Sequence, residues 1–128
     1  MISFRAAVEA RDTAAIEATL AEDVVFTSPV AFKPYPGKAI TAAILRGVLR
    51  VFEDFEYVRE ISDGPDHALI FKAKVNGREV NGCDFIHLND QGLIDDFTVM
   101  IRPLSAATAL SEAMAAQFPR IQSEALNP

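Results

Sequence analysis

The sequence predicts an α+β fold in which helices come first and an antiparallel sheet follows. Apolar residues recur at helical spacing up to residue 52, and from residue 55 their period changes to two. Short turn signals separate the later apolar runs: SDGPD, NG and NDQG. Because connections this short suit antiparallel neighbours, we expect a curved meander with the helices packed on one face.

In the first half of the chain, residues 1–22 read as two short helices. Asp12 fits the N-cap of the second helix, TAAIEATLA. VVFTSPV is β-branched and aromatic, so it predicts a strand that ends near Pro29. KPYPG reads as a loop, and 38–52 as a long helix.

The second half predicts four consecutive strands, FEYVREI, HALIFKAKV, REVNGCDFIHL and LIDDFTVMIRP. A C-terminal helix follows over SAATALSEAMAAQF, with Ser105 near its start. Because Pro119 interrupts the helical pattern, the tail 119–128 is expected to be loose. We therefore predict one domain over 1–118.

Composition excludes several functional classes. The chain has 128 residues, a formal net charge of −6 and no basic cluster, which argues against nucleic acid and anionic membranes as partners. No apolar run is long enough to span a membrane, and the first residues are too charged for a signal peptide. The single cysteine, Cys83, excludes a disulfide within the chain. The two histidines are not spaced as metal ligands usually are, so the sequence does not favour a metal site. We expect a cytoplasmic protein without a cofactor.

Three stretches resemble the nuclear transport factor 2-like superfamily in its SnoaL-like branch: ARDTAAIEATLAEDVVFTSPV, YPGKAI and NGCDFIHLNDQGLIDDF. The resemblance covers roughly residues 1–103. It implies a cone, in which a bent sheet wraps the helices and leaves an apolar pocket between them. The same scaffold carries isomerases, dehydratases, cyclases, epoxide hydrolases and binding domains, so it does not imply one activity.

Asp84 is the candidate site residue, because ketosteroid isomerase-like relatives keep a matching Asp that points into the pocket. A buried carboxyl is costly unless it is paired or protonated, so we expect a raised pKa. Strand alternation, together with the resemblance, predicts that the pocket for a small hydrophobic ligand is lined by Phe4, Phe26, Ser28, Leu69, Phe71, Ile86, Phe97 and Val99.

The resemblance to ketosteroid isomerase is incomplete. Asp84 matches the hydrogen-bond-donating Asp, but the Tyr position falls at Phe4, which has no hydroxyl, and the base position falls at Ser28. Asp84 could be an acid or base, could order the pocket through a hydrogen bond to an amide or a Tyr hydroxyl, or could lie outward in solvent. An isomerase, cyclase or dehydratase-type enzyme and a non-catalytic binding or interaction domain therefore stay open.

Side chains on the sheet face opposite the pocket predict an interface. Ile70, Phe85 and Met100 lie one on each of the last three expected strands. In a meander they can form an apolar band across the outer sheet face, and relatives commonly pair through that face. We expect a homodimer.

Overall fold

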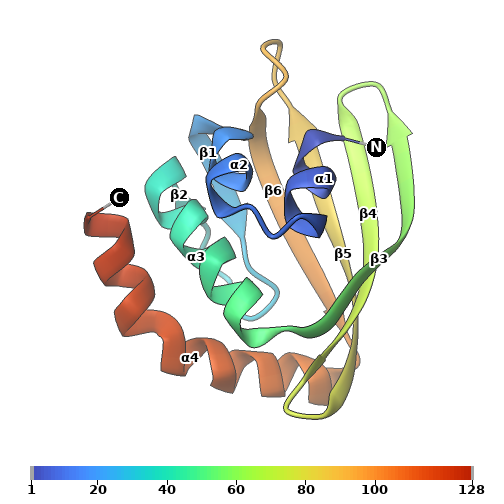
Figure 1. Cartoon of the computed structure of the whole chain (residues 1–128), viewed down its shortest axis with the longest axis vertical. Coiled ribbons are helices and arrows are strands. Elements are labelled where there is room, and N and C mark those ends of the chain that lie inside the picture. The colour runs from blue at the N-terminus through green and yellow to red at the C-terminus, as the bar shows by residue number, and fades with distance from the viewer. Residues whose placement is uncertain (1, 128) are drawn as a thin grey trace.

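The α+β fold is confirmed by a computed structural model that describes residues 2–127 (Figure 1). The elements, in chain order, are α1 (Ser3–Glu9), α2 (Thr13–Ala18), β1 (Leu20–Thr27), β2 (Tyr35–Pro36), α3 (Lys38–Val51), β3 (Glu53–Asp63), β4 (Asp66–Val75), β5 (Arg78–Leu88), β6 (Ile94–Arg102) and α4 (Leu104–Leu126).

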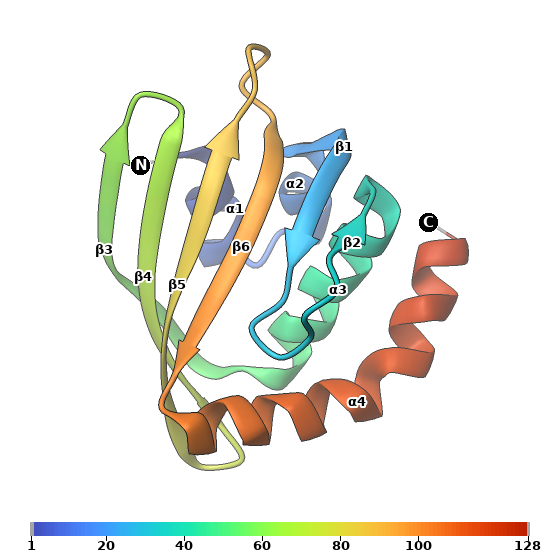
Figure 2. The same cartoon turned by 180° about the vertical axis from the view of Figure 1, so that it is seen from behind.

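One mixed sheet has the strand order β2-β1-β6-β5-β4-β3. Strands β3 to β6 form the predicted antiparallel meander, whereas β1 runs parallel to β6 and carries β2 at the edge (Figure 2). Asn76 and Gly77 both have positive φ, as a tight turn between β4 and β5 requires. Helices α1, α2 and α3 lie against one face of the sheet, which curves around them (Figures 1 and 2).

Two boundaries in the first half differ from the sequence prediction. Asp12 is the N-cap of α2, as predicted, and its Oδ1 accepts a hydrogen bond from the Ala15 amide at 3.0 Å. The helix nevertheless ends at Ala18, because residues from Leu20 onward pair with β6 as strand β1. The predicted loop around Tyr35 contains the short edge strand β2.

The prediction of a loose tail over 119–128 is wrong. Helix α4 passes through Pro119 and continues to Leu126 (Figure 1), while residue 128 lies outside the described residues. The helix bends along its length. Pro119 accounts for a bend, because a proline inside a helix removes one of the helix hydrogen bonds. Ile121 is fully buried, so tertiary packing outweighs the proline's helix-breaking tendency.

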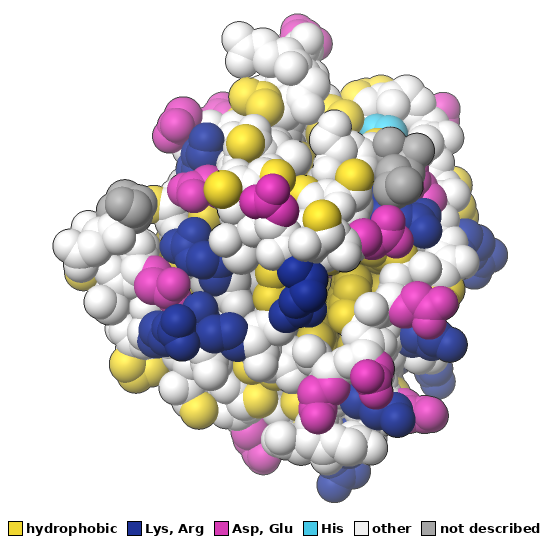
Figure 3. Space-filling model, in the orientation of Figure 1, with side chains coloured by type: hydrophobic (Ala, Val, Ile, Leu, Met, Phe, Trp, Pro, Cys, Tyr) yellow, Lys and Arg dark blue, Asp and Glu magenta, His cyan; other side chains and the backbone are white. Residues whose placement is uncertain are grey.

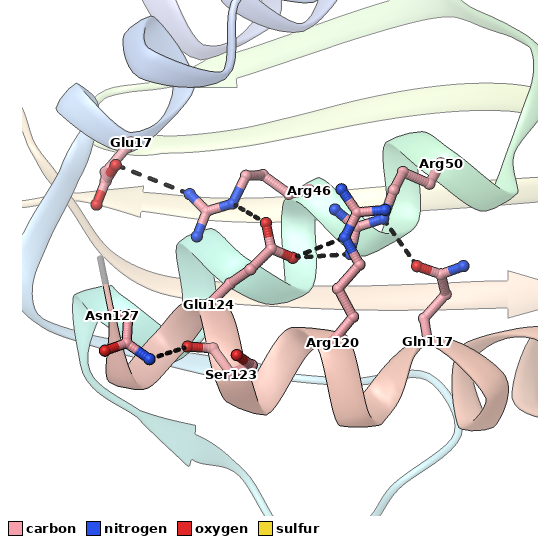
Figure 4. Close-up of polar contacts among 8 residues, drawn as sticks. All are labelled: Glu17, Arg46, Arg50, Gln117, Arg120, Ser123, Glu124 and Asn127. Atoms are coloured by element: carbon pink, nitrogen blue, oxygen red, sulfur yellow. Dashed lines mark hydrogen bonds and ion pairs between the residues drawn. The ribbon is translucent and has the colours of Figure 1, made fainter.

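Packing and charge hold the end of α4 on α3. A Cβ on Gly47 would lie 2.7 Å from Ile121 Cδ1, so the glycine allows the two helices to approach closely. Glu124 accepts hydrogen bonds from Arg50 Nη2 at 2.9 Å and Arg46 Nε at 3.3 Å, and Arg50 also donates to Gln117 (Figure 4).

Within the described residues, no helix is both long and apolar enough to cross a membrane.

We predict that Ile121→Ala lowers the free energy of unfolding by about 2–5 kcal/mol, because it opens a cavity between α3 and α4. Gln122→Ala, at an exposed neighbouring position, is the matched control and should change stability little. Urea denaturation of both variants measures the difference. Equal stabilities would mean that residues beyond Pro119 do not pack as described.

Candidate functional site

Asp84 lies on β5 with its side chain buried on the sheet face that carries the helices. Its residue is 6% exposed, and it pairs across the sheet with Leu69 on β4 and Val99 on β6. The flanking residues Cys83 and Phe85 point to the opposite face, as strand alternation requires. The carboxyl therefore sits in the protein interior and needs a hydrogen-bonding partner.

That partner is Tyr57, whose hydroxyl donates a hydrogen bond to Asp84 Oδ2 at 2.8 Å. Tyr57 belongs to β3, so the bond reaches across the intervening strand β4. The β3–β4 register shifts between Tyr57 and Arg59, and such a bulge changes which side chains of a strand face inward. The sequence analysis allowed a Tyr hydroxyl as a partner of Asp84 without identifying the residue, although the two-residue spacing of Tyr57 from Phe55 was a signal that both face inward.

Burial controls the protonation of both groups. Desolvation raises the pKa of Asp84 to about 7, although the hydrogen bond from Tyr57 acts in the opposite direction. Burial and the neighbouring Asp84 charge raise the pKa of the Tyr57 hydroxyl, which therefore stays protonated. Near neutral pH the pair thus holds a permanent donor, Tyr57, and an acid that populates both of its forms.

The pair opens onto an apolar cavity of about 60 Å³ between the sheet and helices α1 to α3. Five of the residues predicted to line the pocket do line it, together with Asp84: Phe4, Phe26, Phe71, Phe97 and Val99. Among the described residues, Tyr57 and Asp84 are the only lining side chains with polar groups.

The other three predicted lining residues lie elsewhere. Leu69 and Ile86 are buried in the core but do not line the cavity. Ser28 lies outside it, because the turn after β1 directs its Oγ to accept a hydrogen bond from the Val30 amide at 3.1 Å. The residue that the resemblance places at the base position therefore does not reach the cavity.

Sequence reasoning missed an aromatic group at the junction of α3 and β3. Phe52 and Phe55 line the cavity with Phe71, and the Phe55 and Phe71 rings stack with centroids 4.9 Å apart. Phe55 also meets the Tyr57 ring edge to face at 4.9 Å. These contacts restrict the rotation of Tyr57 and so aim its hydroxyl at Asp84.

Charged side chains border the hydrophobic interior on the helical side. Figure 3 shows hydrophobic side chains in a hollow between the N-terminal helices and α3, with Lys or Arg side chains around it. Arg5 lies over the Tyr57 ring, with its guanidinium carbon 5.7 Å from the ring centroid. Arg11 Nη2 donates to the Leu49 carbonyl at 2.9 Å and ties the α1–α2 turn to α3.

The histidines lie away from the cavity. His87 Nδ1 is 2.6 Å from Asp95 Oδ1, and this hydrogen bond raises the pKa of His87. His67 Nδ1 is 2.7 Å from Ser62 Oγ. Across residues 2–127, no group of three or more His, Cys, Asp or Glu side chains is arranged to hold a metal ion.

The residues of the expected dimer interface lie on the outer sheet face. Ile70 pairs with Cys83, and Cys83 pairs with Met100, so the three side chains form one row across β4, β5 and β6. Phe85 lies next to this row and is 42% exposed, while Met100 is 60% exposed.

Together, the curved sheet and the buried acid define an α+β scaffold with an interior apolar cavity. Residues 2–97 match the SnoaL-like domain, and the chain belongs to that family, with the nuclear transport factor 2-like fold expected from the sequence. No curated protein matches the chain.

Several solved structures are similar over most of their length. A steroid delta-isomerase from Pseudomonas aeruginosa is 40% identical, with a TM-score of 0.88 over 94% of this chain and 89% of its own. An uncharacterized protein with a cystatin-like fold from Silicibacter pomeroyi is 38% identical, with a TM-score of 0.85 over 95% of this chain and 91% of its own. An NTF2-like protein from Cytophaga hutchinsonii shares the fold; it is 22% identical, with a TM-score of 0.61 over 79% of this chain and 85% of its own.

We predict that Asp84 makes the protein less stable as pH rises from about 4 to about 7. In this window the folded protein keeps the Asp84 proton, with a pKa of about 7, while the unfolded chain has released it near its usual value of 3.8. The folded state binds more protons, so the free energy of unfolding falls with rising pH, by on the order of 4 kcal/mol in all.

Asp84→Asn should remove this fall, whereas Asp90→Asn, in the exposed β5–β6 turn, should keep it. Denaturant unfolding between pH 4 and pH 8 compares the variants, and an NMR titration of the Asp84 carboxyl carbon gives the pKa directly. A midpoint near ~4 would contradict the prediction.

Proposed function

We propose that this protein binds a small hydrophobic molecule that carries one carbonyl or hydroxyl oxygen, and that it holds this oxygen against Asp84. The observation that carries the proposal is the lining of the cavity, in which Tyr57 and Asp84 are the polar side chains among apolar ones. Ligand sites of this kind use apolar walls for affinity and a few polar groups for orientation.

The hydrogen bonding at Asp84 suits such a ligand. Tyr57 occupies Oδ2, and among the described residues Oδ1 has no hydrogen-bond partner. A protonated Asp84 can therefore donate to a carbonyl oxygen, and an ionised one can accept from a hydroxyl. Because water is largely excluded, either hydrogen bond is stronger than it would be in solution.

An isomerase is the second candidate, and the pKa of Asp84 favours it. A general acid or base works best when its pKa lies near the working pH, and that of Asp84 is about 7. In this mechanism Asp84 takes a proton from the carbon next to the carbonyl and returns it to another carbon, while the Tyr57 hydroxyl turns from Asp84 to donate its hydrogen bond to the enolate oxygen. The similarity to a steroid delta-isomerase supports a reaction of this type.

A separate catalytic base is not expected. Phe4 lacks a hydroxyl and Ser28 lies outside the cavity, bonded to the Val30 amide. A mechanism that divides the work among three polar groups, as in ketosteroid isomerase, therefore has two of its positions unfilled. If the protein catalyses isomerisation, Asp84 alone transfers the proton.

Butan-2-one is a suitable probe, because it has one carbonyl on a short apolar chain. We predict that it binds the native protein and that Asp84→Leu, which removes both the donor and the acceptor, and Tyr57→Phe each weaken binding about 5- to 20-fold, the effect of one buried hydrogen bond. NMR titration measures the affinity. Ser62→Ala, at an exposed position on the outside of β3, is the control and should leave it unchanged.

Hydrogen–deuterium exchange separates binding from catalysis. If Asp84 acts as a base, the native protein speeds exchange of the butan-2-one protons next to the carbonyl in heavy water, and Asp84→Asn does not. Binding without faster exchange would support the ligand-binding function alone. Binding that Asp84→Leu leaves unchanged would overturn the placement of the ligand.

We further propose that two copies associate through the outer sheet face. The row formed by Ile70, Cys83 and Met100, with Phe85 beside it, supports the proposal, because these half-buried and exposed side chains are cross-strand neighbours on three strands. A two-fold axis through this face would bring the same patch together from both subunits.

Light scattering should therefore give the mass of two 14.0 kDa chains. Phe85→Glu should dissociate the dimer, because it buries a charge in the middle of the patch. Leu104→Glu, which replaces an exposed apolar residue on α4 away from the patch, is the control and should stay dimeric. A native mass of one chain at micromolar concentration would exclude this association.

A further inference from the structure

A second hollow, the outer groove, lies beside the cavity that contains Asp84. It has a volume of about 400 Å³ and lies between the β1–β2 connection, α3 and α4. Figures 1 and 2 both show α4 passing below α3 and this connection. Its walls include Val30 on the connection, Tyr35 on β2, and Met114, Ala115 and Phe118 on α4.

The outer groove and the cavity share part of their walls. Phe26, Pro29, Val48 and Leu110 line both. The two spaces are therefore neighbours separated by a single layer of side chains. All four side chains are apolar, so a ligand that displaced them slightly would leave no buried polar group without a hydrogen-bond partner.

We infer that the ligand site is continuous across this layer, and that its ligand is an elongated hydrophobic molecule. The inference rests on the proposed function: the oxygen-bearing end lies at Asp84 and Tyr57, and the apolar tail runs past Pro29 and Leu110 into the outer groove.

The size of the inner cavity supports this arrangement. A cavity of roughly 150 Å³ is needed to hold a benzene molecule, whereas the cavity at Asp84 measures about 60 Å³. It can enclose the polar end of a ligand but not a whole ring system or chain. The remaining apolar part needs a neighbouring space, and the outer groove is apolar, adjacent and several times larger.

The walls of the outer groove suit a flexible apolar tail. Met114 is an unbranched, adaptable side chain, and the Tyr35 and Phe118 rings meet at one end with centroids 6.1 Å apart. On the same connection, Phe32 is fully exposed and could cover a tail that leaves the groove.

Helix α4 supplies this wall from outside the region that matches the SnoaL-like domain, which ends at residue 97. The ion pairs of Glu124 with Arg46 and Arg50 fasten α4 to α3 without any of the three lining the outer groove (Figure 4). The wall is thus held in place by contacts that a substitution in the groove does not touch.

A series of straight-chain methyl ketones tests the inference: butan-2-one, hexan-2-one and octan-2-one. If the tail enters the outer groove, affinity should rise about three- to fourfold for every added methylene. Intermolecular NOEs should connect the terminal methyl of bound octan-2-one with the Met114 methyl. Asp84→Leu should weaken all three ketones by the same factor, because the carbonyl end is common to them.

Ala115→Trp fills the outer groove from an exposed position on α4 and should remove the gain with chain length while butan-2-one binds as before. Ala116→Trp, exposed on the same helix but not lining the groove, is the matched control and should keep the gain.

Butan-2-one binding with no gain along the series, or with no NOE from octan-2-one to Met114, would overturn the inference and leave the proposed function standing. Octan-2-one binding that Asp84→Leu leaves unchanged would show two separate sites and overturn the continuity. If none of the ketones binds, the proposed function itself fails, and the inference with it.

Discussion

The pairing register of the meander β3–β6 is the constraint on which the site depends. Each strand is paired residue by residue with its neighbour, and successive side chains alternate between the two faces. A shift of one residue in β5 would turn Asp84 to the outer face and bring Phe85 inward. The cavity, the buried acid and the apolar outer row are therefore three consequences of one register.

Burial of Asp84 is the costly consequence. The apolar walls that make the cavity suitable for a hydrophobic ligand also raise the pKa of the carboxyl. Tyr57 offsets part of the cost with a hydrogen bond, and the surrounding aromatic rings hold its hydroxyl in place. The protein keeps a polar pair in its interior where an apolar pair would be more stable, which is typical of a functional site.

Two parts of the chain build the proposed ligand space. The region that matches the SnoaL-like domain forms most of the cavity around Asp84, whereas the C-terminal helix α4 contributes Leu110 to it and closes the neighbouring outer groove. Because α4 is anchored by Ile121 and Glu124, at a distance from the groove, its groove-facing residues can vary without loss of the fold. Variation along this wall would change which ligand tails fit and would leave the chemistry at Asp84 intact.

The sequence alone determined the α+β class, the meander and the N-cap at Asp12, because these follow from local periodicity and turn chemistry. The inward direction of Asp84 was expected from the family resemblance, since strand alternation by itself leaves either face open. Only the tertiary structure decided that Tyr57 reaches Asp84, since the bond joins strands separated by β4. It also decided that β1 lies parallel to β6 and that α4 continues past Pro119. These features depend on contacts between residues far apart in the chain, such as Ile121 against Gly47, which no local pattern records.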